Sequence, residues 1–417
     1  MLINKILLVS YFYPPLATPR GTRWFHFANF LADKGIDLDV ISVNPDGIIG
    51  IDNNMAEDIN KRINIKYIEN QLLKLQFWNK HKNNNSFFSF MSKLTYGIIR
   101  RVCYPDAQIF WAINVYRDIL KSKKVDYDCI LTVSNPISTL ILGYLLRKKI
   151  KLYWVCDMGD PWSFNNLIGY KIIRSKLDKI LERKVIEKAD KIVVTTDQTQ
   201  SLFSNLYPNH KHKFFTITQG YDPSLFQNKK RSKYIDEKNL NIVYTGRLYG
   251  KHRNINEFLY ALKELSKYCK DIKFIFAGIT ERDFVYKIKK LGLENNIDII
   301  GYLPSHEIAI LQKNADVLLH LGNNSLTQLP GKIFEYIGSG RPIFGIYYFA
   351  GDIGKEIIEK KSLGITCAND RDNIQESLKK IIDLWRKGQL KELRNEQTTG
   401  NFDWHSTAEQ FYRLLTN

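Results

Sequence analysis

The chain has 417 residues, 44% of them hydrophobic and 25% charged, which is typical of a folded globular protein and excludes a largely disordered or fibrous one. At ~100–200 residues per domain, this length predicts two domains or three. The 61 Lys and Arg residues exceed the 43 Asp and Glu residues and give a net charge of +18, which favours an anionic partner. A nucleic acid, a phosphorylated substrate and a membrane surface all fit that charge.

The cysteines and histidines give no sign of a metal site. The five cysteines form no Cys-x-x-Cys pair and the eight histidines no His-x-x-x-His pair, so we expect neither a disulfide framework nor a bound metal. No apolar run reaches the ~20 residues that span a bilayer, and the first residues lack a small-residue cleavage site. We therefore expect a cytoplasmic protein.

Short apolar runs alternate with amphipathic stretches of helical length, the pattern of βα units around a parallel sheet. The first unit is complete, because a strand at 5–10 is followed by a helix at 22–34, Gly35 and a strand at 37–43. Further elements in this half are strands at 129–133, 152–156 and 191–195 and helices at 137–147 and 171–188.

A second series of the same kind follows a hinge and linker at 216–239. We therefore place the domains at 1–218 and 219–400, and expect a helix at about 401–417 to cross back onto the first domain. The elements expected in the second series are strands at 241–244, 273–277, 297–300 and 317–320 and a helix at 256–268.

One segment, from Gln71 to Arg101, interleaves six aromatic rings with six cations and has no acidic residue. Such a surface suits an anionic membrane, whose headgroups meet the cations while the rings bury at the interface. A solvated insertion whose rings fold back on the domain explains the same composition equally well.

The stretch from Leu329 to Pro342 predicts a short helix at 330–337, because Pro330 stands at its start and glycines at its end. Lys332 and Glu335 lie three residues apart and so share one face. A phosphate at the helix N-terminus would favour the lysine there, and the carboxylate would accept the hydroxyl protons of a ribose. A plain surface ion pair is the simpler interpretation of the same spacing.

Seven short motifs occur in order along the two halves of the chain. They are Tyr11-Phe12-Tyr13-Pro14-Pro15, Tyr104-Pro105-Asp106 with Trp111, Asp157-Met158-Gly159-Asp160-Pro161-Trp162, Gly220-Tyr221-Asp222, Gly246-Arg247-Leu248, Pro330-Gly331-Lys332-Ile333-Phe334-Glu335-Tyr336 and Gly340-Arg341-Pro342. In this order they resemble the retaining GT-B glycosyltransferases of family 4, in a bacterial branch that makes surface polysaccharides. The resemblance covers nearly the whole chain.

The resemblance implies an α/β protein of GT-B type, with two Rossmann-like domains whose parallel sheets face across a cleft. A nucleoside-diphosphate-sugar donor would bind mainly to the second domain and the acceptor to the first. No cofactor and no metal are implied. The donor-site residues that it implies are Gly246, Pro330, Gly331, Lys332 and Glu335, with Gly21 of the first domain near the phosphate.

Catalysis in such an enzyme would depend on charge placed at the donor diphosphate. The resemblance assigns Arg247 and a second cation to that task, and Lys251, His252 and Arg253 all stand near the second position. We choose Arg253 because it directly precedes the next predicted helix.

In the first domain, Asp157 and Asp160 follow a predicted strand and would lie at the edge of the sheet where ligands bind. Either carboxylate would orient or deprotonate an acceptor hydroxyl, and we choose Asp160 as the catalytic candidate. A helix-capping turn with a packed Trp162 is the alternative explanation of the same residues.

Two positions depart from the family pattern. The family has a second glutamate where this chain has Thr327, and only Gly21 remains of the glycines in its first loop, with Arg20 and Arg23 adding charge.

The sequence predicts a retaining hexosyltransferase-type enzyme, acting on a glycan or a polyprenyl-diphosphate-linked acceptor in surface polysaccharide biosynthesis. Peripheral contact with the inner face of the plasma membrane is a further hypothesis. Nucleic acid is not an expected partner, because no nucleic-acid motif accompanies the cations. The alternatives are a GT-B-fold sugar-nucleotide epimerase or hydrolase, and a catalytically silent nucleotide-sugar-binding or scaffold protein.

Overall fold

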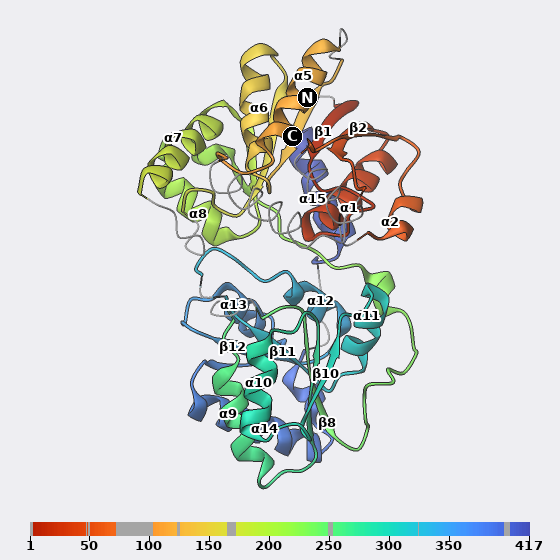
Figure 1. The fold of residues 1–417 in the computed structure, drawn as a ribbon, viewed down its shortest axis with the longest axis vertical. Coiled ribbons are helices and arrows are strands. Elements are labelled where there is room, and N and C mark those ends of the chain that lie inside the picture. Colours follow the sequence, from red (N-terminus) through yellow and green to blue (C-terminus); the bar gives the residue numbers. More distant parts are fainter. Residues whose placement is uncertain are drawn as a thin grey trace, which may run out of the picture. The chain divides into compact units, whose positions relative to one another are not determined.

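The computed structural model describes residues 3–46, 48, 51–71, 103–122, 126–164, 172–248, 253–323, 325–395 and 401–417. These residues divide into two compact units (Figure 1). Unit 1 comprises Met1–Thr218 and Trp404–Asn417, and unit 2 comprises Gln219–Asp403. No helix in the described ranges is long and apolar enough to cross a membrane.

Unit 1 is built on a seven-stranded sheet in the order β3-β2-β1-β4-β5-β6-β7, and each of these neighbouring pairs is parallel. The strands are β1 (Lys5–Ser10), β2 (Asp37–Val43), β3 (Ile63–Ile68), β4 (Cys129–Val133), β5 (Tyr153–Gly159), β6 (Lys191–Val194) and β7 (Phe214–Thr216). The helices are α1 (Pro19–Asp33), α2 (Asn53–Glu57), α5 (Ile109–Lys121), α6 (Ser138–Lys149), α7 (Ile172–Lys188), α8 (Asp197–Leu206) and α15 (Trp404–Thr416), with the 3₁₀ helix η1 (Pro208–Lys213).

Helices cover both faces of this sheet, which explains why its central strands are apolar throughout. Successive side chains of β1 point to opposite faces, so Leu7 and Val9 belong to the core with α5 and α6. Ile6 and Leu8 belong to the other core, with α1 and α15.

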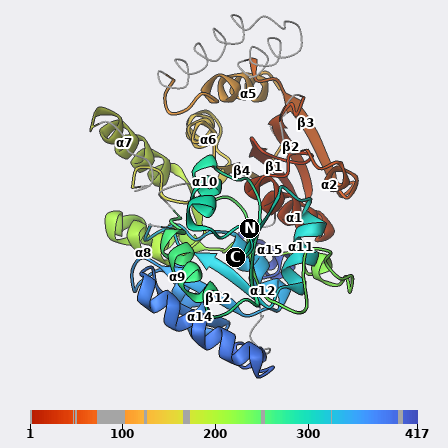
Figure 2. The ribbon, with the colours of Figure 1, turned by 60° about the horizontal axis from the view of Figure 1, so that its bottom comes forward.

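The C-terminal helix α15 lies alongside α1 within unit 1 (Figures 1 and 2). Phe411 makes an edge-to-face contact with Trp24 at 5.3 Å between ring centroids, and Trp404 stacks on His26 at 5.2 Å. Aromatic packing therefore fixes the chain's last helix on the same unit as its first.

Helix α1 begins earlier than the expected residue 22. The Thr18 hydroxyl accepts a hydrogen bond from the Gly21 amide at 3.0 Å, and Pro19 occupies the first helical turn. This N-cap and proline start the helix at Pro19, a signal that was present in the sequence.

Unit 2 contains a six-stranded sheet in the order β10-β9-β8-β11-β12-β13, also parallel. The strands are β8 (Leu240–Thr245), β9 (Ile272–Ala277), β10 (Ile297–Gly301), β11 (Val317–Leu321), β12 (Ile343–Tyr347) and β13 (Gly364–Ala368). The helices are α9 (Asn256–Ser266), α10 (Arg282–Leu291), α11 (Ser305–Asn314), α12 (Lys332–Ser339), α13 (Ile353–Lys360) and α14 (Arg371–Arg386), with the 3₁₀ helices η2 (Pro223–Phe226) and η4 (Leu390–Leu393).

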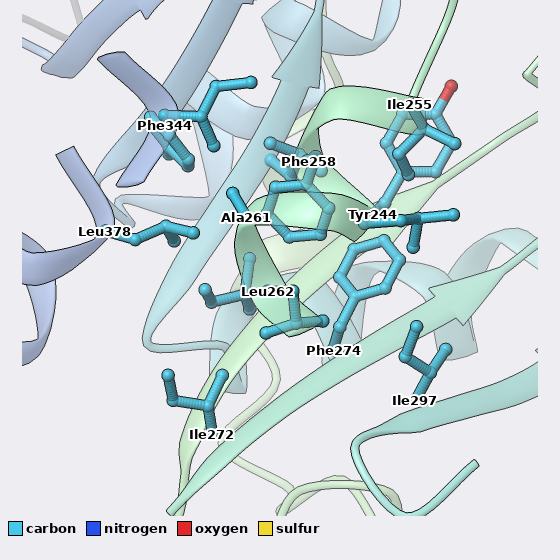
Figure 3. Close-up of a cluster of buried hydrophobic side chains, with 14 of the residues drawn as sticks. Tyr244, Ile255, Phe258, Ala261, Leu262, Ile272, Phe274, Ile297, Phe344 and Leu378 are labelled. Carbon is cyan, nitrogen blue, oxygen red and sulfur yellow. The ribbon is translucent and has the colours of Figure 1, made fainter. Parts of the chain in front are cut away.

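The larger core of unit 2 lies between the sheet and helices α9, α10 and α14. Figure 3 shows Phe258 and Leu262 of α9 against Phe274 of β9. The rings of Phe258 and Phe274 meet edge to face at 4.9 Å. The opposite face of the sheet is covered by α11, α12 and α13.

Helix α12 occupies Lys332–Ser339, so the prediction of 330–337 was wrong by two residues at each end. Pro330 and Gly331 form the preceding turn, in which the Ile333 amide donates to the Pro330 carbonyl at 3.2 Å. The other end is capped by Arg394, whose guanidinium donates to the carbonyls of Ile337 at 2.7 Å and Arg341 at 2.8 Å. A cation at a helix C-terminus is favourable, so Arg394 anchors α12.

A buried charged cluster joins α1, β5 and the segment that follows β7. Asp157 is 1% exposed and accepts hydrogen bonds from Arg23 at 3.1 Å and from the Trp24 indole at 2.8 Å. The fully buried Arg23 also donates to the carbonyls of Ile217 and Thr218. Burial lowers the pKa of Arg23, and the carboxylate opposes that change.

We predict that Arg23→Met destabilises the protein by about 3–5 kcal/mol, because it leaves the Asp157 carboxylate buried without its main partner. Denaturant unfolding followed by tryptophan fluorescence measures the change. Arg62→Met is the matched control, since Arg62 and Asp37 form an ion pair at 3.0 Å with both side chains 55% exposed. The control should cost less than about 1 kcal/mol, and equal losses for the two variants would contradict the assignment.

Candidate functional site

The carboxyl ends of β8 and β9 meet through two glycines. The Gly246 amide donates to the Ala277 carbonyl at 2.8 Å, and a Cβ on Gly278 would lie 1.9 Å from the Gly246 carbonyl oxygen. Gly246 has φ of 126° and Gly278 has φ of 155°, values that favour glycine. The nearest atom to a Cβ on Gly246 would be Cγ of Lys332, at 3.9 Å, so this turn lies beside α12.

Lys332 and Glu335 form the ion pair that their spacing allowed. The Lys332 ammonium lies 2.8 Å from Oε1 and 2.6 Å from Oε2 of Glu335, with about a third of each side chain exposed. The amide nitrogen of Gln312 donates to Oε2 at 3.0 Å and to the Thr245 hydroxyl at 2.9 Å. The carboxylate is thus held from two sides and still reaches solvent.

Gln312 was not among the expected site residues. It lies on α11 and is 0% exposed, and its Oε1 has no hydrogen-bond partner within the described part of the chain. A single glutamine in the row Ile308, Leu311, Gln312, Ala315 interrupts the buried face of a helix. That interruption is the signal from which it was predictable.

The two expected diphosphate cations lie near each other in the loop that follows β8. Nε of Arg247 is 3.6 Å from Glu281, and its side chain is 49% exposed. Arg253 donates to the Arg247 carbonyl at 3.2 Å and to the side-chain oxygen of Asn323 at 2.8 Å. Arg253 therefore connects the loops after β8 and β11, and Asn323 is a second residue that the sequence did not reveal.

Lys251 and His252, the other candidates for the second cation, lie outside the described residues. Thr327 is buried in the loop after β11, where its amide donates to the Ser325 hydroxyl at 3.4 Å. Pro330 and Gly331 lie in the turn before Lys332. The expected residues of unit 2 that the structure describes thus belong to two loops, after β8 and after β11, and to helix α12.

His320 lies in β11, close to the point where the strand enters the loop that contains Asn323. It is 2% exposed, and its Nδ1 is 2.8 Å from the Tyr347 hydroxyl. Burial, and secondarily the charge of Arg253, lower the pKa of His320 to about 3, so the ring is neutral at pH 7.

In unit 1, Gly21 is required by its own loop. A Cβ at this position would lie 2.4 Å from the Leu16 carbonyl oxygen, and the Gly21 amide already donates to the Thr18 hydroxyl that caps α1. Arg20 lies 3.5 Å from Asp157 and against Gly159, and Arg23 lies 3.1 Å from the same carboxylate. Both cations are used to neutralise Asp157.

Asp160 follows β5 and is partly exposed, with the Thr195 hydroxyl 3.4 Å from its Oδ1. Trp162 nearby is buried, as the alternative explanation proposed, and its indole donates to Asp178 at 3.0 Å. Tyr104 donates to the same carboxylate at 2.8 Å. Two of the unit-1 motifs are therefore joined through an α7 residue that the sequence did not single out.

Within the described ranges, no group of three or more His, Cys, Asp or Glu side chains is placed to hold a metal ion. The basic and aromatic segment from Gln71 to Arg101 lies outside the described residues, Gln71 excepted. Its proposed contact with a membrane stays a prediction.

Comparison with known proteins identifies a domain family in unit 2 and the fold of the whole chain. Residues 226–399 match the family model of glycosyl transferases group 1, so unit 2 contains a domain of that type. The chain matches no curated protein in sequence.

The solved structures that resemble the chain cover it almost completely. Sucrose-phosphate synthase from Thermosynechococcus elongatus superposes with a TM-score of 0.70 at 13% identity, covering 99% of this chain and 98% of that chain. A glycosyltransferase from Rickettsia africae ESF-5 superposes with a TM-score of 0.68 at 15% identity, covering 99% of this chain and 97% of that chain. UDP-GlcNAc 2-epimerase from Neisseria meningitidis, solved with UDP-GlcNAc bound, superposes with a TM-score of 0.59 at 14% identity, covering 99% of this chain and 100% of that chain. The expected α/β fold of GT-B type is confirmed.

Asp352, at the start of α13 in unit 2, is a buried carboxyl group whose pKa can be tested through the stability of the protein. The carboxyl group is 3% exposed and caps α13 by accepting from the Gly354 amide at 2.7 Å. Burial raises its pKa from 3.8 to about 6, and the backbone amides partly oppose that rise. The folded state then binds more protons than the unfolded state between about pH 4 and pH 6, so the free energy of unfolding falls as the pH rises through that range.

We predict that Asp352→Asn is more stable than the native protein at pH 7.5 and equally stable at pH 4. Asparagine keeps the capping oxygen but removes the buried charge, and a shift of about two pKa units corresponds to at most ~3 kcal/mol. Denaturant unfolding of both proteins at the two pH values measures the difference. A difference that does not change with pH would show that this carboxyl group ionises as freely as one in water.

Proposed function

We propose that the protein is a glycosyltransferase that moves a sugar from a nucleoside-diphosphate-sugar to an acceptor hydroxyl. The observation that carries the proposal is the partly exposed carboxylate of Glu335, which Lys332 and Gln312 hold beside the turn at Gly246. The match of residues 226–399 to glycosyl transferases group 1 supports it independently.

Glu335 would accept hydrogen bonds from the two ribose hydroxyls of the donor. A carboxylate that already has one oxygen fixed by an amide and a lysine is preorganised for that task, because its rotamer is set before the ligand arrives. Lys332 would then face the donor phosphates at the N-terminus of α12, with Pro330 and Gly331 in the turn that precedes it.

Arg247 and Arg253 would stabilise the leaving diphosphate. Arg253 is held by Asn323 and by the Arg247 carbonyl, so little reorganisation is needed when negative charge develops. Half of the Arg247 side chain is exposed, and the guanidinium is able to exchange Glu281 for a phosphate. We further propose that two guanidinium groups suffice without a metal, which activity in the presence of EDTA would test.

The finer points of the proposal are retention of configuration at the anomeric carbon, a hexose-type donor sugar and a glycan or lipid-linked acceptor bound by unit 1. Asp160 is the proposed group that orients the acceptor hydroxyl, since it is the carboxylate at the end of β5 that keeps exposure. In a retaining transfer the departing diphosphate takes the proton on the same face, so Asp160 need not be a strong base.

An epimerase is the second candidate, favoured by the fold likeness to UDP-GlcNAc 2-epimerase. A silent binding protein is the third, because Thr327 stands where the resembling family has a glutamate. A thermal-shift screen with UDP-, GDP-, ADP- and dTDP-sugars identifies the donor. Product analysis with and without an acceptor then separates transfer from epimerisation, hydrolysis and mere binding.

We predict that Glu335→Gln weakens nucleotide-sugar binding by about ten- to a hundredfold, because hydrogen bonds to a charged acceptor are each worth about 1.5–3 kcal/mol. Isothermal calorimetry with the donor found in the screen measures the affinity. The matched control is Glu264→Gln, which removes another helical i,i+3 pair, with Lys267 at 2.6 Å. The Glu264→Gln variant should bind the donor as tightly as the native protein does. Unchanged affinity in Glu335→Gln would place the donor elsewhere.

We predict that Arg247→Ala lowers turnover by about 10²–10³, the loss observed when one preorganised transition-state donor is removed. Steady-state kinetics with the identified donor gives the value. Arg386→Ala is the control, because Arg386 is 51% exposed and pairs at 3.3 Å with Asp271, which precedes β9 at the opposite end of the strand. Equal turnover in the two variants would remove Arg247 from the mechanism.

A further inference from the structure

Helix α7 presents three of its aliphatic side chains outward and two of its carboxylates inward, while Val185 and Ile186 of the same helix are buried in the core. Ile173, Leu177 and Ile180 are 77%, 45% and 51% exposed, whereas Asp178 and Glu182 are 0% exposed. The three aliphatic residues recur at intervals of four and three, so they form one continuous row along the helix. Figures 1 and 2 show α7 at the periphery of unit 1.

The two buried carboxylates fix this orientation. Glu182 accepts from the backbone amides of Trp162 and Ser163, from the Ser163 hydroxyl and from Tyr207, at 2.8–3.0 Å. Asp178 accepts from the Trp162 indole and from Tyr104. Rotating the helix to bury the aliphatic row would break these hydrogen bonds and leave the loop amides unsatisfied, so the row is held outward.

Cations border the row. Lys176, Lys179, Arg183 and Lys184 are all exposed, and Lys176, Arg183 and Lys184 fall on the same side of the helix as the aliphatic residues. The acidic residues of α7 are Asp178, Glu182 and Glu187. The first two are buried away from this surface, and Glu187 is exposed on it, so three cations there stand against one carboxylate. The surface of α7 is therefore aliphatic at its centre and positive at its margin.

We propose that this surface of α7 docks the protein on an anionic lipid membrane. The aliphatic row enters the acyl boundary while the bordering cations meet the headgroups, as in interfacial helices that lie in the membrane plane. A second copy of the chain would bring the same cations against each other, and a nucleic acid would gain nothing from isoleucine and leucine, which offer no ring for base stacking.

The surface belongs to unit 1, which the proposed function assigns to the acceptor. Docking would thus bring that unit to the place where a lipid-linked acceptor is found. The inference does not depend on the transferase activity, because vesicle binding is measured without any sugar.

Co-sedimentation of the full chain with vesicles tests the proposal. We expect binding to vesicles that contain phosphatidylglycerol, at least tenfold weaker binding to pure phosphatidylcholine, and loss of binding between 0.1 and 0.5 M salt as the cations are screened. The triple variant Ile173→Ser, Leu177→Ser, Ile180→Ser should bind phosphatidylglycerol vesicles at least tenfold less. Because the three side chains are exposed, circular dichroism should show an unchanged fold.

The matched control is Tyr268→Ser, Tyr286→Ser, Tyr302→Ser in unit 2, where the side chains are 85%, 68% and 77% exposed. This control should bind vesicles as the native chain does. A second variant, with Lys176, Arg183 and Lys184 changed to Gln, should lose binding at 0.1 M salt.

Three results would overturn the proposal. The first is a native chain that ignores phosphatidylglycerol vesicles at low salt. The second is an α7 triple variant that binds them as the native chain does, which would place the contact elsewhere, for example on the segment from Gln71 to Arg101. The third is a native dimer in light scattering that the α7 triple variant converts to monomer, which would make the surface an interface between copies.

Discussion

Parallel pairing of the strands is the constraint on which the rest of the structure depends. Because neighbouring strands run in one direction in both sheets, the carboxyl ends of β8, β9 and β11 open onto the same edge of unit 2, and those of β5 and β6 onto one edge of unit 1. Residues far apart in sequence, such as Arg253 and Asn323, become hydrogen-bond partners there without any local signal. The same pairing buries both faces of each sheet under helices, so the loops at the carboxyl edge are where polar groups can meet a ligand.

The carboxylates show how the protein separates buried charge from charge that a ligand can reach. Asp157 is buried and neutralised by Arg20, Arg23 and the Trp24 indole, so none of its negative charge faces solvent. Glu335 has a comparable number of partners, Lys332 and Gln312 among them, but its side chain is a third exposed. Partner number does not distinguish the two groups, and exposure does. For this reason Glu335, and not Asp157, is the carboxylate available to a ligand.

The sequence predicted the central strands well, and it singled out some, not all, of the residues that gather at the candidate site. Strands β1, β4, β8 and β11 lie in the middle of their sheets, and burial on both faces gives them continuous apolar runs that are visible in one sequence. The edge strand β3 has the mixed run Ile-Asn-Ile-Lys-Tyr-Ile and the other edge strand, β7, has three residues, so neither carried enough signal. A motif singled out Glu335, and Arg253 was chosen because it precedes a predicted helix; both stay predictions. Gln312 and Asn323 are single polar residues whose importance arises only from tertiary contacts.

Helix α7 shows why periodicity alone is insufficient. Its extent was predicted nearly to the residue, but the usual rule that aliphatic positions face the core holds only for part of it. Val185 and Ile186 are buried in the core, whereas the row at 173, 177 and 180 is exposed. The loops containing Tyr104 and Trp162 expose backbone and ring donors that need acceptors, and only a helix with inward carboxylates supplies them. An unsatisfied buried donor costs about as much free energy as one buried aliphatic side chain gains. Because Asp178 and Glu182 satisfy six donors, that gain outweighs burying the three aliphatic side chains of the row. The hydrogen-bond requirement of two loop motifs thus determines which face of the helix reaches the surface, and with it the chemistry of that surface.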